Sequence, residues 1–170
     1  MGLFSLPPKT PEIYSNLELF KQADGLETGI SRFRRMLAPE WFPQSGIQLT
    51  WPHAGTDWNY MLDKVTACYL RLAYEIAVRE RLLIVCPDPA EVERLLNEQL
   101  PKKATDNITY FACPTNDTWA RDHAFLSVVD TDGVHLLDYR FNGWGGKFEA
   151  SLDNAINRRL YEQGAVKGLY

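Results

Sequence analysis

The residues with the clearest potential for chemistry lie between Asn116 and Asp122, in the order Asn-Asp-Thr-Trp-Ala-Arg-Asp. This stretch combines two carboxylates, an indole and a guanidinium. A carboxylate accepts two parallel hydrogen bonds from a guanidinium group, and the face of a tryptophan ring attracts the same planar cation. The stretch therefore predicts a site for a guanidino compound, with Asp117, Trp119 and Asp122 as the residues that contact it.

A second candidate loop follows at residues 141–147, with the sequence Phe-Asn-Gly-Trp-Gly-Gly-Lys. Its glycines allow the backbone to approach a ligand closely. Trp144 is the candidate substrate-binding residue of this loop. The alternative interpretation of Trp144 and its neighbour Gly145 is an ordinary tight turn.

The first stretch also has structural interpretations, which the sequence leaves open. Asp122 could form an ion pair with Arg121 or Arg140 instead of binding a ligand. Asp117 follows an asparagine and could shape the loop through an Asx turn. Trp119 could be a core residue, as most single tryptophans are.

The cysteines and histidines lack the settings that are typical of catalysts. The spacing of Cys68, Cys86 and Cys113 matches no zinc or redox motif, and no metal site is expected. Cys68 is expected on the apolar stripe of a helix and Cys86 at the end of a buried strand, so both should be inert. Cys113 lies beside the candidate loop, and reactivity is its less favoured interpretation. We expect structural roles for the three histidines, His53, His123 and His135.

Composition and charge argue against several classes of protein. A chain of 170 residues, 45% hydrophobic and 24% charged, is typical of one globular domain or half of a larger one. The net charge of −4 gives no basic surface for nucleic acid. No apolar run reaches the length of a membrane span, and the N-terminus resembles no signal peptide, so a cytoplasmic location is expected.

Strands and helices are expected to alternate, which predicts an α/β fold. The N-terminal extension should cover residues 1–37, with a short helix around 29–37, and the domain residues 38–170. The expected strands are residues 47–51, 82–86, 108–112 and a hairpin of 125–129 with 134–139. The expected helices begin at Thr56 or Asp57, at Asp88, which is followed by Pro89 and Glu91, and near Leu152.

Several motifs occur in an order typical of one enzyme family. They are Pro39-Glu40-Trp41, Gln44-Ser45-Gly46, Trp51-Pro52-His53, Thr56-Asp57-Trp58 and the two loops above. From about residue 38 onward, the chain resembles the agmatine deiminases and the Porphyromonas-type peptidylarginine deiminases, which belong to the guanidine-modifying pentein superfamily. The Trp-Gly-Gly-Lys loop resembles the agmatine branch more closely.

The resemblance implies a five-bladed α/β propeller with the site in its central channel. It also implies hydrolysis of a guanidinium to a ureido group and ammonia, which for agmatine gives N-carbamoylputrescine. In this family a cysteine thiolate attacks the guanidinium carbon, a histidine moves protons and two aspartates hold the substrate. Asp122 matches the first, catalytic aspartate, and Trp119 matches a residue lining the substrate. No metal or organic cofactor is implied.

In the family, the catalytic histidine, the second aspartate and the cysteine come later than the last residue here, Tyr170. We therefore expect about half of a propeller, which binds substrate without turnover. Such a half would expose sheet edges and should self-associate. Two alternatives stay open. One is a peptidylarginine deiminase, and the other is a non-catalytic guanidino-binding or interaction fragment.

Overall fold

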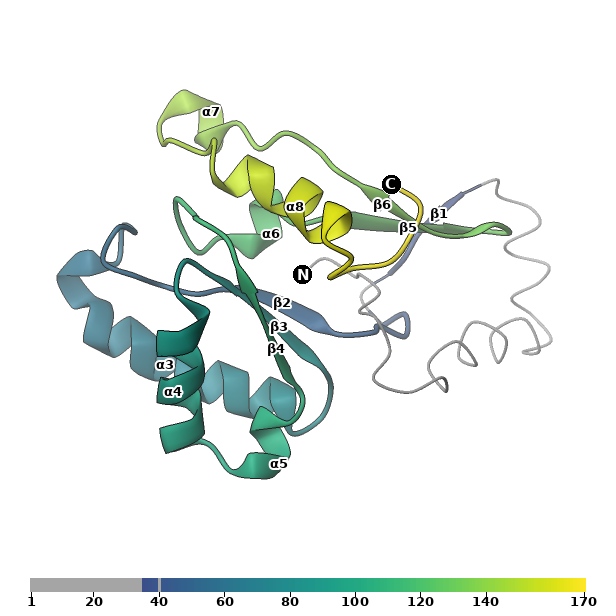
Figure 1. Cartoon of the computed structure of the whole chain (residues 1–170). Coiled ribbons are helices and arrows are strands. Elements are labelled where there is room, and N and C mark those ends of the chain that lie inside the picture. Colours follow the sequence, from purple (N-terminus) through teal and green to yellow (C-terminus); the bar gives the residue numbers. More distant parts are fainter. Residues whose placement is uncertain (1–34, 40) are drawn as a thin grey trace.

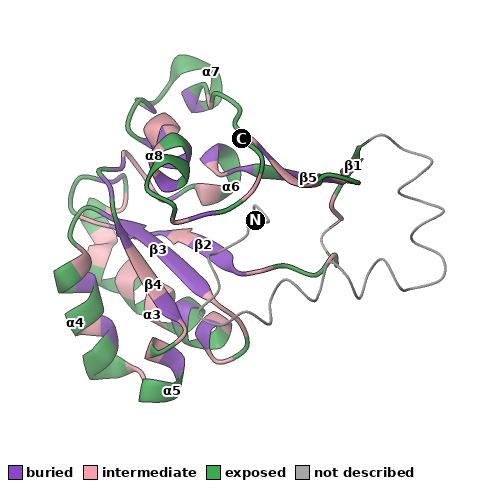
Figure 2. Cartoon of the chain, turned by 45° about the vertical axis from the view of Figure 1, so that its right-hand side comes forward, coloured by how far each residue is buried: buried purple, intermediate pink, exposed green. Residues whose placement is uncertain are grey.

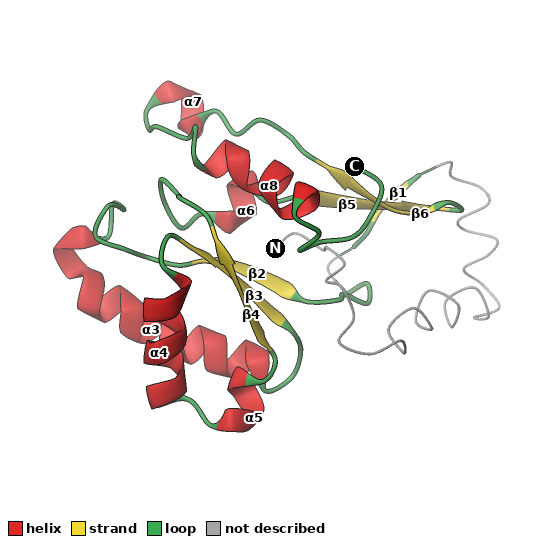
Figure 3. Cartoon of the chain, in the orientation of Figure 1, coloured by secondary structure: helices red, strands yellow, loops and turns green. Residues whose placement is uncertain are grey.

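The structure is a computed structural model that describes residues 35–39 and 41–170. Its strands form two three-stranded sheets, with helices on both faces of one of them (Figure 1, Figure 3). The strands are β1 (Met36–Leu37), β2 (Ile47–Thr50), β3 (Leu82–Cys86), β4 (Ile108–Ala112), β5 (Leu126–Asp130) and β6 (Gly133–Leu137). The α-helices are α3 (Leu62–Ala77), α4 (Pro89–Gln99), α5 (Lys102–Thr105), α6 (Ala120–His123), α7 (Gly143–Gly146) and α8 (Ile156–Glu162), and the 3-10 helices are η2 (Asn59–Met61) and η3 (Asp153–Ala155).

The first sheet is parallel, in the order β2-β3-β4, and confirms the three strands expected there. All five residues of the central strand β3 are buried, and Figure 2 shows it as a buried strip through the sheet. Alternate side chains point to opposite faces. Leu82, Ile84 and Cys86 pack towards α3 and α4, whereas Leu83 and Val85 pack towards α8 and the second sheet.

Of the two helices that pack on this sheet, α4 begins where the sequence predicts and α3 does not. Helix α4 begins after Asp88, whose carboxylate accepts hydrogen bonds from the backbone of Ala90 and Glu91, as the sequence predicts. Helix α3 begins only at Leu62, so the predicted start near Thr56 is wrong. The Thr56 side chain instead donates a hydrogen bond to the His53 carbonyl oxygen within a turn.

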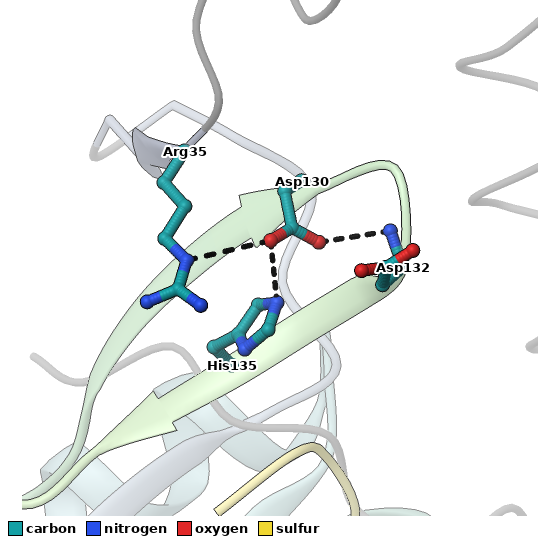
Figure 4. A network of polar contacts seen from close by, with 4 residues as sticks. All are labelled: Arg35, Asp130, Asp132 and His135. Carbon is teal, nitrogen blue, oxygen red and sulfur yellow. Dashed lines mark hydrogen bonds and ion pairs between the residues drawn. The ribbon is translucent and has the colours of Figure 1, made fainter.

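The second sheet is antiparallel, in the order β1-β5-β6, and contains the expected hairpin. Asp130, at the hairpin turn, accepts a hydrogen bond from the Asp132 backbone and makes ion-pair contacts with His135 (2.6 Å) and Arg35 (Figure 4). The contact with His135 is the main reason that the pKa of Asp130 lies below its ordinary value. This network ties the segment before β1 to the hairpin.

Two expectations for the N-terminal part and for α3 need correction. The helix expected around residues 29–37 lies largely outside the described residues, and its last two residues form β1, paired with β5. Cys68, expected on the buried stripe of α3, is exposed. The stripe that does reach the core there includes Ala73 and Ala77.

A shared core joins the two sheets. Phe111 and Phe125 pack with leucine and isoleucine side chains from β3 and α8, and these residues are almost completely buried. The α/β class is confirmed, and neither of the two sheets in the described part of the chain closes on itself. No described helix has the length and apolarity needed to cross a membrane.

Candidate functional site

The two candidate loops lie at the end of β4 and after β6. We call residues 113–119 the first site loop and residues 141–152 the second site loop. The first site loop leads directly into the short helix α6, which carries Asp122 on an exposed position. Trp119 immediately precedes α6 and is 41% exposed, so it is not an ordinary core tryptophan. Asp122 and the Trp119 ring are therefore both open to a ligand.

Asp117 turns back onto its own loop. One carboxylate oxygen accepts a hydrogen bond from the Thr118 backbone at 2.8 Å, and the other accepts one from the Trp119 indole at 3.0 Å. Partial burial raises the pKa of Asp117, and these two hydrogen bonds oppose that rise. The carboxylate thus shapes the loop, as one interpretation of the sequence allowed, and it also holds the indole.

Trp58 belongs to this site, although its residue type and spacing did not single it out. Its indole N–H donates to the Thr118 hydroxyl at 2.9 Å. Its ring lies 5.9 Å from the Trp119 ring, centroid to centroid, with the planes tilted by 39°. The Thr56-Asp57-Trp58 motif was the available signal, but the motif alone did not say which distant residue Trp58 contacts.

The structure brings Trp144 to Trp119. Their ring centroids are 5.7 Å apart and their planes are nearly perpendicular, at 83°. Phe141 and Phe148 make similar edge contacts with Trp144. These four rings and Trp58 form one aromatic cluster, in which the two predicted tryptophans meet.

The backbone of the second site loop is unusual at Trp144. Trp144 has φ 52° and ψ 52°, and it is the one residue other than glycine with positive φ in the described part of the chain. The label α7 therefore covers a left-handed turn and no regular helix. Gly143 is required beside it, because a Cβ atom there would lie 2.1 Å from the Phe148 carbonyl oxygen. Strained backbone of this kind is often found at functional sites.

Polar side chains join the two site loops. Asp153 is 2% exposed and accepts hydrogen bonds from the backbone N–H groups of Asn116 and Asp117. In return, the Asn116 side chain accepts hydrogen bonds from the backbone of Leu152 and Asp153. Sequence reasoning missed Asp153, because its partners lie 36 and 37 residues away.

The histidines near the site have structural partners. His53 accepts a hydrogen bond from Gly55 at Nδ1, so its Nε2 carries the proton and donates to Thr115 at 3.0 Å. His123 is 1% exposed, and its Nε2 contacts the Thr50 hydroxyl at 3.3 Å. Burial lowers the pKa of His123 to about 4, so its ring is neutral at pH 7.

Comparison with known proteins identifies the family of this chain. The sequence model of the Porphyromonas-type peptidyl-arginine deiminase family matches residues 36–169. The chain belongs to this family. The match covers both sheets, both site loops and Trp58, so the aromatic cluster lies wholly within the deiminase region.

Solved deiminase structures show the same fold for this region. A Porphyromonas gingivalis protein, provisionally described as an arginine deiminase, is 47% identical, with a TM-score of 0.66 over 76% of this chain. A cysteine-to-serine variant of C. jejuni agmatine deiminase, with substrate bound, is 32% identical, with a TM-score of 0.68 over 76% of this chain. The agmatine deiminase of Medicago truncatula is 28% identical over 137 residues, or 72% of this chain.

The chain is short compared with these deiminases. It spans 37% of each of the two solved chains and 35% of the Medicago protein. The region that it shares with them holds the candidate guanidinium-binding residues described above.

Proposed function

We propose that the chain forms the guanidinium-binding part of an agmatine-deiminase-type site. In this proposal Asp122 holds the guanidinium group, and Trp119 and Trp144 form two walls of the substrate site. One observation carries the proposal: two partly exposed indoles meet almost at right angles, and one of them immediately precedes the helix that bears an exposed aspartate.

The chemistry of these groups matches an alkylguanidine. The Asp122 carboxylate has two oxygens that can accept two parallel N–H bonds from a guanidinium. The faces of Trp119 and Trp144 attract cations and also cover a short alkyl chain, because an indole is both electron-rich and apolar. Both rings keep a large part of their surface exposed, at 41% and 39%.

The reaction that we infer for the complete site is hydrolysis of the guanidinium with water to a ureido group and ammonia. The two sheets would then be units of a propeller, and this chain would supply binding residues without the nucleophile. The three cysteines support that division. Cys113 is buried in the shared core, where Arg159 donates to its sulfur, and burial raises the pKa of Cys86 to about 12. Cys68 is exposed on α3, in a different element from either site loop.

The second candidate substrate is an arginine side chain in a peptide or protein. The match to the peptidyl-arginine deiminase family favours it. The second site loop, whose Trp-Gly-Gly-Lys sequence resembles the agmatine branch, favours a free alkylguanidine instead. Arg140, next to that loop, is a single arginine and gives little basis for gripping a peptide carboxylate.

Binding of agmatine to the 170-residue chain tests the proposal. Asp122→Asn should weaken agmatine binding by about tenfold or more, because an amide presents one acceptor oxygen and no charge. Asp63→Asn is the matched control, since Asp63 is an exposed aspartate in the first turn of α3. Titration calorimetry measures both variants, and equal affinities would show that Asp122 does not hold the guanidinium.

Two further measurements define the reaction and the substrate. Ammonia release from agmatine should be absent for the chain alone, and turnover that is lost in Cys113→Ala would instead make Cys113 the nucleophile. A peptide with C-terminal arginine should compete poorly with agmatine for the chain. Tighter binding of the peptide would transfer the assignment to the second candidate substrate.

A further inference from the structure

We propose that Asp117 and Trp58 are positioning residues that fix the Trp119 indole, and that Asp117 is not itself a ligand of the substrate. This inference rests on the proposed function, because it takes Trp119 as a wall of the guanidinium site. It gives Asp117 a different role from the substrate contact that its place in the sequence suggested.

The first support is the direction of the Asp117 carboxylate. Its two oxygens accept from the Thr118 backbone (2.8 Å) and from the Trp119 indole (3.0 Å). A bidentate guanidinium needs both oxygens of a carboxylate along its own edge. Asp117 uses both oxygens on its own loop, whereas no such partner engages the exposed Asp122 carboxylate in the described part of the chain.

The second support is the attachment of Trp58 to Thr118, the residue directly before Trp119. The Thr118 hydroxyl accepts the Trp58 indole N–H at 2.9 Å. Thr118 is 7% exposed, so this junction is buried. Trp58 therefore anchors the residue that precedes Trp119 to the start of η2.

Together these contacts restrict the Trp119 ring in two ways. An indole has a single N–H donor, and a bond from it to Asp117 sets the direction of the ring edge. The rings of Trp58 and Trp144 then flank it at centroid distances of 5.9 and 5.7 Å. A partly exposed tryptophan that is held before the ligand arrives loses less conformational freedom on binding.

The Trp119 indole N–H resonance of the 170-residue chain reports this positioning directly. Nuclear magnetic resonance can assign the signal by its loss in Trp119→Phe. Asp117→Asn should move the resonance and speed its exchange with solvent, because an amide has one neutral acceptor oxygen for the two donors, the Thr118 backbone and the Trp119 indole. The control Asp63→Asn should leave it unchanged. An unchanged resonance in Asp117→Asn would overturn the role of Asp117.

Trp58→Phe tests the second positioning residue separately. It keeps an aromatic ring and removes the N–H donor to Thr118, so the Trp119 resonance should move. Trp41→Phe is the control, since Trp41 is 87% exposed. If Trp58→Phe leaves the Trp119 resonance in place, Trp58 does not position the indole.

Agmatine affinity distinguishes a positioning residue from a ligand. Asp117→Asn should weaken binding by about two- to tenfold in the parent chain, the range of one aromatic contact. In the Trp119→Phe chain the same change should cost less than about twofold, because the indole N–H that Asp117 acts through is absent. Equal losses in both chains would overturn the proposal and make Asp117 a ligand.

These titrations should be made at high salt, near 0.5 M, where the Debye length is about 4 Å and the charge of Asp117 is screened at longer range. Failure of the proposed function has a different signature. If the parent chain binds no agmatine, that function fails for this chain, and the indole resonance still decides whether Asp117 and Trp58 hold Trp119.

Discussion

The parallel sheet β2-β3-β4 and the two site loops are held by different interactions. In the sheet, backbone groups bond to backbone groups in register, and alternate apolar side chains fill the cores on its two faces. In the site loops, backbone N–H groups bond mainly to side chains. The Asp153 side chain accepts hydrogen bonds from the backbone N–H groups of Asn116 and Asp117. The Asn154 side chain accepts one from Phe141, and the Asn142 side chain accepts one from Gly145.

This difference has consequences for how each region responds to mutation. Many residues are buried in the sheet. Truncating any one of them should lower the free energy of unfolding strongly, while the structural change stays confined to the packing around that residue. Each loop conformation depends on one or two polar side chains, and their loss leaves buried N–H groups without partners. We therefore expect the largest losses of stability from changes in the sheet, and changes in the shape of the site from loss of its polar side chains.

The largest effect should follow from opening a cavity in the sheet. Ile84→Ala should lower the free energy of unfolding by about 4 kcal/mol, because the Ile84 side chain on β3 is completely buried against α3 and α4. Leu72→Ala is the control, with Leu72 43% exposed on α3, and should cost about 1 kcal/mol or less. Urea unfolding measures both variants, and equal losses would contradict the central role of β3.

The next effect concerns His123, which joins the sheet to the site. Its ring contacts Thr50 on β2, its carbonyl oxygen accepts a hydrogen bond from Asn157, and it ends the helix that carries Asp122. The buried Nδ1 has no hydrogen-bond partner in the described part of the chain. Protonation there would place an unpaired charge in the core, which is why burial lowers the pKa of His123 to about 4.

The lowered pKa of His123 gives a pH dependence of known sign. The unfolded state, with a pKa near 6.5, binds more protons than the folded state between about pH 6.5 and 4. Above pH 6.5 the neutral ring makes its full contribution to the free energy of unfolding. That free energy falls by about 3 kcal/mol as the pH drops to about 4. Urea unfolding at several pH values measures this, and His123→Gln should remove that part of the dependence. A parent chain equally stable at pH 7 and pH 4.5 would contradict it.

The sheet could be predicted from the sequence because its signals are local. The runs at residues 82–86 and 108–112 are mostly apolar and bounded by turns. The first matches β3 and the second matches β4. Asp88 followed by Pro89 marks the start of α4 in the same way.

The site could be predicted only in part, because its contacts are distant in sequence. Asp117, Trp119 and Trp144 were candidates by residue type, and Trp119 and Trp144 do meet. The start of α3 was misplaced because the pattern assigned Trp58 to the helix, whereas its indole N–H binds Thr118, 60 residues away. No local pattern reveals a partner at that separation.

A smaller loss of stability should follow from releasing the two site loops from each other. Asp153→Ala should lower the free energy of unfolding by about 2 kcal/mol, because it leaves the N–H groups of Asn116 and Asp117 without their acceptor. Asp153→Asn is the matched control, since its amide oxygen can still accept those bonds. Thermal or urea unfolding compares the two variants. Equal losses would show that the charge of Asp153, and not its hydrogen bonds, matters.

The smallest effect on stability, with a clear effect on binding, is expected at Trp144. A left-handed backbone at a residue other than glycine costs about 1–2 kcal/mol, and Trp144→Gly removes that cost together with the edge contacts of the ring. The two changes oppose each other, so stability should stay within about 1 kcal/mol of the parent chain. Agmatine binding should weaken by about three- to thirtyfold, because one aromatic wall is gone.

The matched variant for this test is Trp144→Ala, which removes the same ring and keeps the left-handed strain of a residue with a Cβ atom. It should bind agmatine as weakly as Trp144→Gly and be less stable than that variant by about 1 kcal/mol. Urea unfolding and calorimetry on the same two proteins separate the outcomes. Equal stability of the two variants would show that the Trp144 backbone is not strained. Unchanged agmatine affinity in both would remove Trp144 from the site and leave Trp119 as its aromatic wall.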